Sequence, residues 1–98
     1  MSHTLVIKEE AARETIESYL WHEARVEGLG ESFLGELDKC YSAVLQNPEA
    51  FQKQYKSFRQ ANIRRFPFVM TFEIENDDVV VYSVFHTSRN PRKKYPKF

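Results

Sequence analysis

The stretch from Arg65 to Pro91 constrains the fold most, because it reads as two long strands joined by a tight turn. In its first half, residues predicted to face a core alternate with residues predicted to face away from it: Phe68, Met70, Phe72 and Ile74 against Val69, Thr71, Glu73 and Glu75. Asn76-Asp77-Asp78 predicts the turn. Residues 79–86 are apolar on both faces, which is typical of a strand inside a sheet.

The residues before this pair predict a strand over 4–7 and a helix over about 9–26. On that helix, the pattern predicts an apolar side and an opposite charged side: Ala12, Ile16, Tyr19 and Leu20 against Glu10, Arg13, Glu14 and Glu17. Gly28 and Gly30 predict a reversal. A second helix is expected over about 31–46, ended by Asn47-Pro48. Gly35 inside it costs roughly 1 kcal/mol relative to alanine, which favours a close approach of the first helix at that point.

Residues 49–58 predict a polar connection, and residues 60–65 predict a further strand. The expected order is therefore β-α-α-β-β-β. It belongs to the α+β class, with a helical hairpin on one face of a small, twisted, mostly antiparallel sheet. We expect one domain over residues 1–98, with a basic tail over 92–98.

The net charge of zero hides a split between the two halves of the chain. Residues 1–49 hold four Lys or Arg and ten Asp or Glu, whereas residues 50–98 hold ten and four, so the halves carry −6 and +6. This asymmetry is typical either of two solvated faces or of a basic surface that meets an acidic partner. A lone cysteine excludes an internal disulfide, and no spacing suits a metal. Without a leader or membrane-span pattern, we expect a cytoplasmic protein with no cofactor.

Candidate site residues lie at the two ends of the strand pair. His86 ends the last strand, where it can act as a general acid or base, or its ring can simply bond the following turn. Arg64 and Arg65 can bind phosphates or a carboxylate, or remain solvated. The basic tail can contact RNA or only aid solubility. Its residues of interest are Arg89, Arg92, Lys93, Lys94 and Tyr95. His22 and His3 each occur alone and favour structural roles.

These elements, taken in order, resemble toxins of the RelE/ParE superfamily of bacterial type II toxin–antitoxin modules. The resemblance spans nearly all of residues 4–91. It rests on the first strand, the helical hairpin and four motifs: Leu29-Gly30-x-x-Phe33-Leu34-x-Glu36-Leu37, Asn47-Pro48, Arg65-Phe66-Pro67-Phe68, and Phe85-His86-Thr87-Ser88-Arg89-Asn90-Pro91. It implies a toxin, of the plasmid-stabilisation kind, that a cognate acidic antitoxin neutralises.

The superfamily divides by target. RelE-like members cut mRNA on the ribosome, whereas ParE-like members poison DNA gyrase. In an alignment with RelE, the strand arginine of the nuclease falls on Val69, and its two lysines fall on Gln60 and Asn62. The face that should hold the phosphate therefore has no cation, which favours a gyrase-binding, non-enzymatic toxin. The alternatives are an endoribonuclease that uses His86 and Arg89, with Arg64 and Tyr95 as auxiliaries, and a degenerate member that binds an antitoxin without being toxic.

Overall fold

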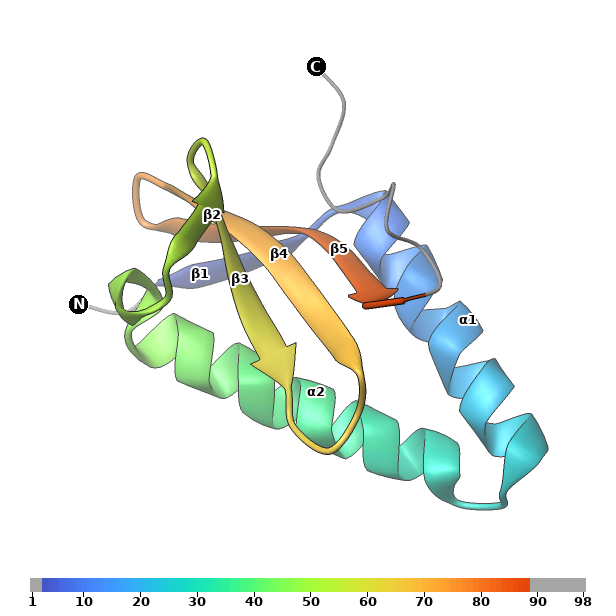
Figure 1. Cartoon of the computed structure of the whole chain (residues 1–98). Helices are drawn as coiled ribbons and strands as arrows, with labels where there is room; N and C mark the ends of the chain where they lie inside the picture. The colour runs from blue at the N-terminus through green and yellow to red at the C-terminus, as the bar shows by residue number, and fades with distance from the viewer. Residues whose placement is uncertain (1–2, 89–98) are drawn as a thin grey trace.

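The computed structural model describes residues 3–88, which form two helices packed on a five-stranded sheet (Figure 1). The elements in chain order are β1 (Thr4–Ile7), α1 (Glu9–Arg25), α2 (Leu29–Gln46), the 3₁₀ turn η1 (Pro48–Ala50), β2 (Lys53–Tyr55), β3 (Phe58–Ile63), β4 (Phe68–Glu75) and β5 (Asp78–His86). The strands lie in the order β1-β5-β4-β3-β2, and every pair except β1 with β5 is antiparallel. The predicted α+β architecture is confirmed.

The sequence left open where the first strand pairs. In the structure, β1 runs parallel to β5, with Leu5 opposite Val79 and Ile7 opposite Val81. This pairing places β5 between β1 and β4, as its apolar character on both faces predicted. The helical hairpin leads from β1 at one edge of the sheet to β2 at the opposite edge, and the chain reaches β5 only after β2, β3 and β4.

The polar connection predicted over residues 49–58 contains regular elements that were not predicted. This stretch contains η1 and β2, and β3 begins at Phe58, two residues before the expected start. All three residues of β2 are exposed, so the strand has no alternation that would reveal it in the sequence. The Arg59 guanidinium holds the stretch in place by donating to the carbonyl oxygens of Phe51 (2.6 Å) and Glu49 (3.4 Å).

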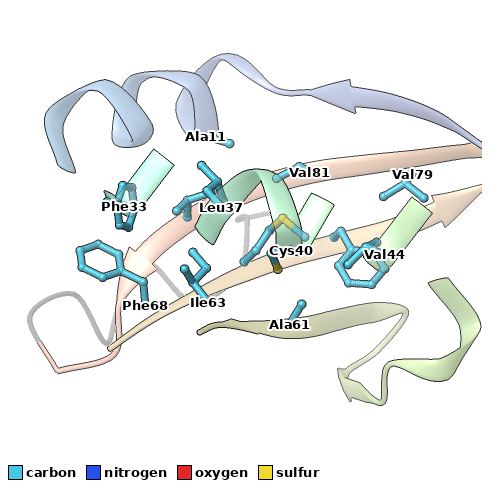
Figure 2. Packing of buried hydrophobic residues seen from close by; sticks show 13 residues of the cluster. Ala11, Phe33, Leu37, Cys40, Val44, Ala61, Ile63, Phe68, Val79 and Val81 are labelled. Carbon is cyan, nitrogen blue, oxygen red and sulfur yellow. The ribbon is translucent and has the colours of Figure 1, made fainter. Parts of the chain in front are cut away.

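A hydrophobic cluster joins α2 to the sheet. Figure 2 shows this cluster, with Phe33, Leu37, Cys40 and Val44 on α2 and with Ala61, Ile63, Phe68, Val79 and Val81 on the strands. The α2 residues recur every three or four positions, so they lie along one side of the helix. The predicted apolar side of α2 is confirmed, and this packing fixes the helix across β3 and β4.

The predicted buried side of α1 is wrong. Ile16 and Leu20 are 61% and 59% exposed, whereas the buried side is formed by Ala11, Glu14, Ser18 and His22. The reason is the position of α1 beside the end of β5, where β1 has already stopped (Figure 1). There Glu14 Oε1 accepts hydrogen bonds from the Val84 N–H (3.0 Å) and the Ser83 hydroxyl (3.0 Å). The backbone N–H of Val84 at the edge of β5 needs a hydrogen-bond acceptor, and the Glu14 carboxylate supplies it.

The close approach of the two helices occurs at Gly30, not at Gly35 as predicted. A Cβ at Gly30 would lie 2.8 Å from the Tyr19 carbonyl oxygen, whereas a Cβ at Gly35 would meet no atom of the described residues within 4 Å. Gly28 has a left-handed φ of +87°, which turns the chain into α2. The carboxylate of Glu23 accepts the N–H groups of Gly28 (2.8 Å) and Gly30 (2.9 Å), so it stabilises the reversal.

Candidate functional site

The structure brings the two ends of the strand pair to the same end of the sheet. Phe68 pairs with Ile63 on one side and with His86 on the other, so the β3–β4 bend lies beside the end of β5. The N–H of Thr87 donates to the Pro67 carbonyl oxygen (2.9 Å) and joins the two segments directly. The arginine pair before the bend and the histidine that ends β5 therefore belong to one surface.

His86 is half-buried on this surface, and its ring bonds the following turn. The Ser88 N–H donates to His86 Nδ1 (3.1 Å), and the imidazole meets the Phe68 ring edge-on at 5.2 Å between centroids. Since Nδ1 accepts a backbone hydrogen bond, the neutral ring carries its proton on Nε2. The structural interpretation of His86 accounts for this geometry, and any proton transfer by the ring would have to use Nε2.

The two arginines gather around one buried carboxylate of α2. Arg65, which has a left-handed φ of 73°, places its guanidinium 3.8 Å from Glu36 Oε2, and Lys39 Nζ lies 3.5 Å from the same oxygen. The Glu36 side chain is 8% exposed, whereas that of Arg65 is 75% exposed. Arg64 is exposed and lines a pocket that also contains Glu36 and Lys39. The buried Glu36 carboxylate is thus surrounded by a basic rim, which consists of Lys39, Arg64 and Arg65.

Sequence reasoning missed Glu36 as a site residue, although a signal was present. Glu36 follows Phe33 by three residues and precedes Cys40 by four, so it falls on the apolar side of α2. The other predicted site residues, which are Arg89, Arg92, Lys93, Lys94 and Tyr95, lie outside the residues that the structure describes.

A cluster of aromatic rings packs against the bend between β3 and β4. The buried His22 ring stacks on Phe33 (4.9 Å, 14°) and meets Phe66 edge-on (5.1 Å). Its Nδ1 lies 2.6 Å from the Ser18 carbonyl oxygen, which can only accept, so Nδ1 carries the proton. The expected structural role of His22 is confirmed: this ring links α1, α2 and the bend that holds the arginines.

The sheet face that bears Val69, Thr71 and Glu73 does not form an open, cationic surface. Val69 and Thr71 were expected to point away from the core, but they are buried, with 5% and 0% exposure. Large side chains of neighbouring strands share this face: Phe85 pairs with Val69, and the Phe58 ring packs edge-on against Tyr82.

The charged side chains that β4 contributes to the same face are acidic, while Lys8 Nζ lies 5.9 Å from the centre of the Tyr82 ring. The Tyr82 hydroxyl donates to Glu73 Oε1 (3.0 Å) and to Glu75 Oε2 (3.3 Å), and the Ser57 hydroxyl donates to Glu73 Oε2. Desolvation, with these two carboxylates, raises the pKa of Tyr82, so its hydroxyl stays protonated as a donor. β4 and β5 contain no Lys or Arg. The arrangement suits neutral and cationic groups better than phosphate.

Within residues 3–88, no cluster of three or more His, Cys, Asp or Glu side chains could hold a metal ion. Neither of the helices in this part of the chain is long and apolar enough to cross a membrane.

The sequence matches a family model over residues 5–91. That model describes the ParE toxin of the type II toxin–antitoxin system parDE. The match covers both helices and all five strands apart from the first residue of β1. No curated protein matches the sequence.

The fold is shared with solved structures of toxin–antitoxin systems. A chain of the chromosomal ParDE toxin–antitoxin system of P. aeruginosa aligns with a TM-score of 0.77 and 11% identity, over 87% of this chain and 96% of that one. A chain of the intact E. coli RelBE toxin–antitoxin complex aligns with a TM-score of 0.68 and 20% identity, over 90% and 100%. A mutant E. coli RelE toxin in complex with an antitoxin RelBc peptide aligns with a TM-score of 0.62 and 20% identity, over 100% and 99%.

Proposed function

The chain belongs to the ParE toxin family of type II toxin–antitoxin systems, and we propose that it stops growth by binding DNA gyrase. It acts as a single toxin domain in the cytoplasm, without a cofactor and without a chemical step of its own. Its contact surface is basic and includes Arg64 and Arg65, together with Arg89, Arg92, Lys93 and Lys94.

The observation that carries the proposal is the character of the central strands. Cutting RNA requires donors or cations aimed at the phosphoryl group, and loss of one such donor typically lowers the rate by about 10²–10³. β4 and β5 contain no Lys or Arg, and Val69 and Thr71 are buried. The one arginine of β3, Arg59, donates to the backbone of Phe51 and Glu49. These features favour binding over catalysis.

A cognate antitoxin completes the proposed system. Two of the structures that share the fold are described as complexes of a toxin with its antitoxin. The +6 charge of residues 50–98 favours an acidic partner. We therefore expect a tight complex with an acidic protein encoded beside this one, and purification of the chain alone from its native operon would contradict this.

The second candidate function is ribosome-dependent cleavage of mRNA. The position of His86 beside the arginine-bearing bend is what favours it. In that case His86 and Arg89 would be catalytic, with Arg64 and Tyr95 assisting. His86→Ala and Arg89→Ala should then each abolish cleavage, because acid–base catalysis contributes roughly 10²–10⁴-fold. A third candidate is a degenerate member that binds an antitoxin but does not inhibit growth.

Induction of the protein in growing cells separates the three candidates. Gyrase binding predicts early DNA damage and filamentation, while protein synthesis continues at first. Sudden loss of protein synthesis with cut mRNA would instead support the endoribonuclease. Normal growth, with the protein shown to accumulate, would contradict both and leave only the degenerate member.

A further inference from the structure

We propose that a pocket between α2 and β3 receives one hydroxyl- or carboxamide-bearing side chain from an acidic, extended segment of a protein partner. The inference rests on the proposed function, in which that partner is the antitoxin. It specifies the pocket at which the antitoxin binds and the kind of side chain that the antitoxin inserts there.

The pocket is the right size for a single side chain. Its volume is about 210 Å³, and it is lined by Glu36, Lys39, Cys40 and Ala43 of α2, by Asn62 and Arg64 at β3 and the turn that follows, and by Phe51. Sites for drug-sized ligands usually measure roughly 300–1,000 Å³. The thiol, the methyl group and the phenyl ring suit the apolar part of a side chain, which argues against a large metabolite.

One residue of the pocket wall, Glu36, has a buried acceptor without a partner among residues 3–88. Glu36 is 7% exposed, and its ion pairs with Lys39 and Arg65 are made through Oε2. Within the described residues, Oε1 is buried and has no hydrogen-bond partner. An unsatisfied buried carboxylate oxygen is costly, so a ligand that brings a donor gains free energy beyond its apolar contacts.

The charge around the pocket indicates a neutral donor rather than a cationic one. Among the lining residues, Lys39 and Arg64 oppose Glu36, which gives +1, and the nearby Arg65 raises this to +2. A third or fourth cation would be repelled, whereas carboxylates next to the inserted side chain would be attracted. The partner segment is therefore acidic, with a hydroxyl or carboxamide at the inserted position.

The open edge of β3 beside the pocket suits an extended segment. Among the described strands, β2 pairs only with the first two residues of β3, Phe58 and Arg59. Further along, the Asn62 carbonyl oxygen accepts a weak hydrogen bond from Cys40 Sγ (3.8 Å), so it faces this edge. In an antiparallel strand, the N–H of the same residue faces the same way. Asn62 can therefore bond the backbone of an added strand.

The phosphate groups of a nucleic acid fit this pocket poorly, although the rim of the pocket is basic. A phosphate diester offers only acceptors, and the buried Glu36 carboxylate repels it. A protein segment can satisfy both Oε1 and the rim.

Filling the pocket tests the proposal. Ala43 is an exposed residue at the pocket, so Ala43→Phe should block it without disturbing the core. Ser42→Phe is the matched control, because Ser42 is the preceding exposed residue of α2 and does not line the pocket. The probe is the acidic protein encoded beside this chain, titrated by calorimetry. We expect Ala43→Phe to weaken its binding by about tenfold or more and Ser42→Phe to leave it unchanged.

The lone cysteine gives a second readout in the unmodified protein. Burial raises the pKa of the Cys40 thiol to about 11, so alkylation by iodoacetamide is followed at about pH 9, where more thiolate forms than at neutral pH. The bound antitoxin should slow this alkylation by about tenfold or more. Poly-U RNA should not slow it.

Each of the other outcomes would contradict one particular part of the proposal. Equal binding by both variants, or unchanged alkylation in the complex, overturns the pocket but leaves the antitoxin in place. Protection by poly-U RNA in place of the antitoxin overturns the choice of a protein ligand. Absence of any binding by the unmodified chain overturns the antitoxin itself, and the pocket proposal with it.

Discussion

At the residue scale, the two buried glutamates, Glu14 and Glu36, each organise the polar groups around them. Glu14 closes the edge of β5, and Glu36 organises the basic rim around the pocket. Helical periodicity assigned Glu14 to solvent, because a charged residue on an amphipathic helix usually lies there. Its burial depends on an unpaired N–H of β5, and only the three-dimensional arrangement shows where that N–H lies.

Replacing Glu14 should be costly. Glu14→Ala leaves the Val84 N–H and the Ser83 hydroxyl without their acceptor, so we expect the free energy of unfolding to fall by about 2–4 kcal/mol. Urea unfolding measures this. Glu17→Ala, one turn further along on the exposed side of α1, should change it by less than about 0.5 kcal/mol. A similar loss in both variants would contradict the role of Glu14.

At the element scale, the long strands and both helices could be predicted because their patterns extend over many residues. The short β2 could not, since its three exposed residues carry no periodicity. The side of α1 that faces inward was also missed, because Ile16 and Leu20 remain exposed while a polar side packs against β5. Packing at an open sheet edge favours hydrogen-bonding groups, and hydrophobic periodicity does not report them.

The helical hairpin gives a matched pair of glycine substitutions. Gly30→Ala should destabilise the fold by about 1–3 kcal/mol, because its Cβ would lie 2.8 Å from the Tyr19 carbonyl oxygen. Gly35→Ala should stabilise it by about 0.5–1 kcal/mol, because alanine favours a helix interior and the site is open. Thermal unfolding of the two variants checks the signs, and a stabilising Gly30→Ala would refute the close approach there.

At the scale of the whole molecule, the fold and the family followed from the sequence, whereas the arrangement of the candidate site residues did not. The motifs around Arg65 and His86 lie far apart in the sequence, and the strand register shows that they are adjacent at one end of the sheet. The pocket needed Glu36, Asn62 and Phe51, which lie far apart in sequence and meet only through packing. No local pattern could have joined them.

We propose that this toxin binds gyrase and has no nuclease chemistry. The most direct measurement adds the purified chain, in parallel, to DNA gyrase from its own organism and to translating ribosomes carrying an mRNA. We expect loss of supercoiling or trapped gyrase–DNA cleavage complexes, unchanged by His86→Ala, and intact mRNA. Cleavage of the mRNA that His86→Ala abolishes, with gyrase unaffected, would contradict the claim.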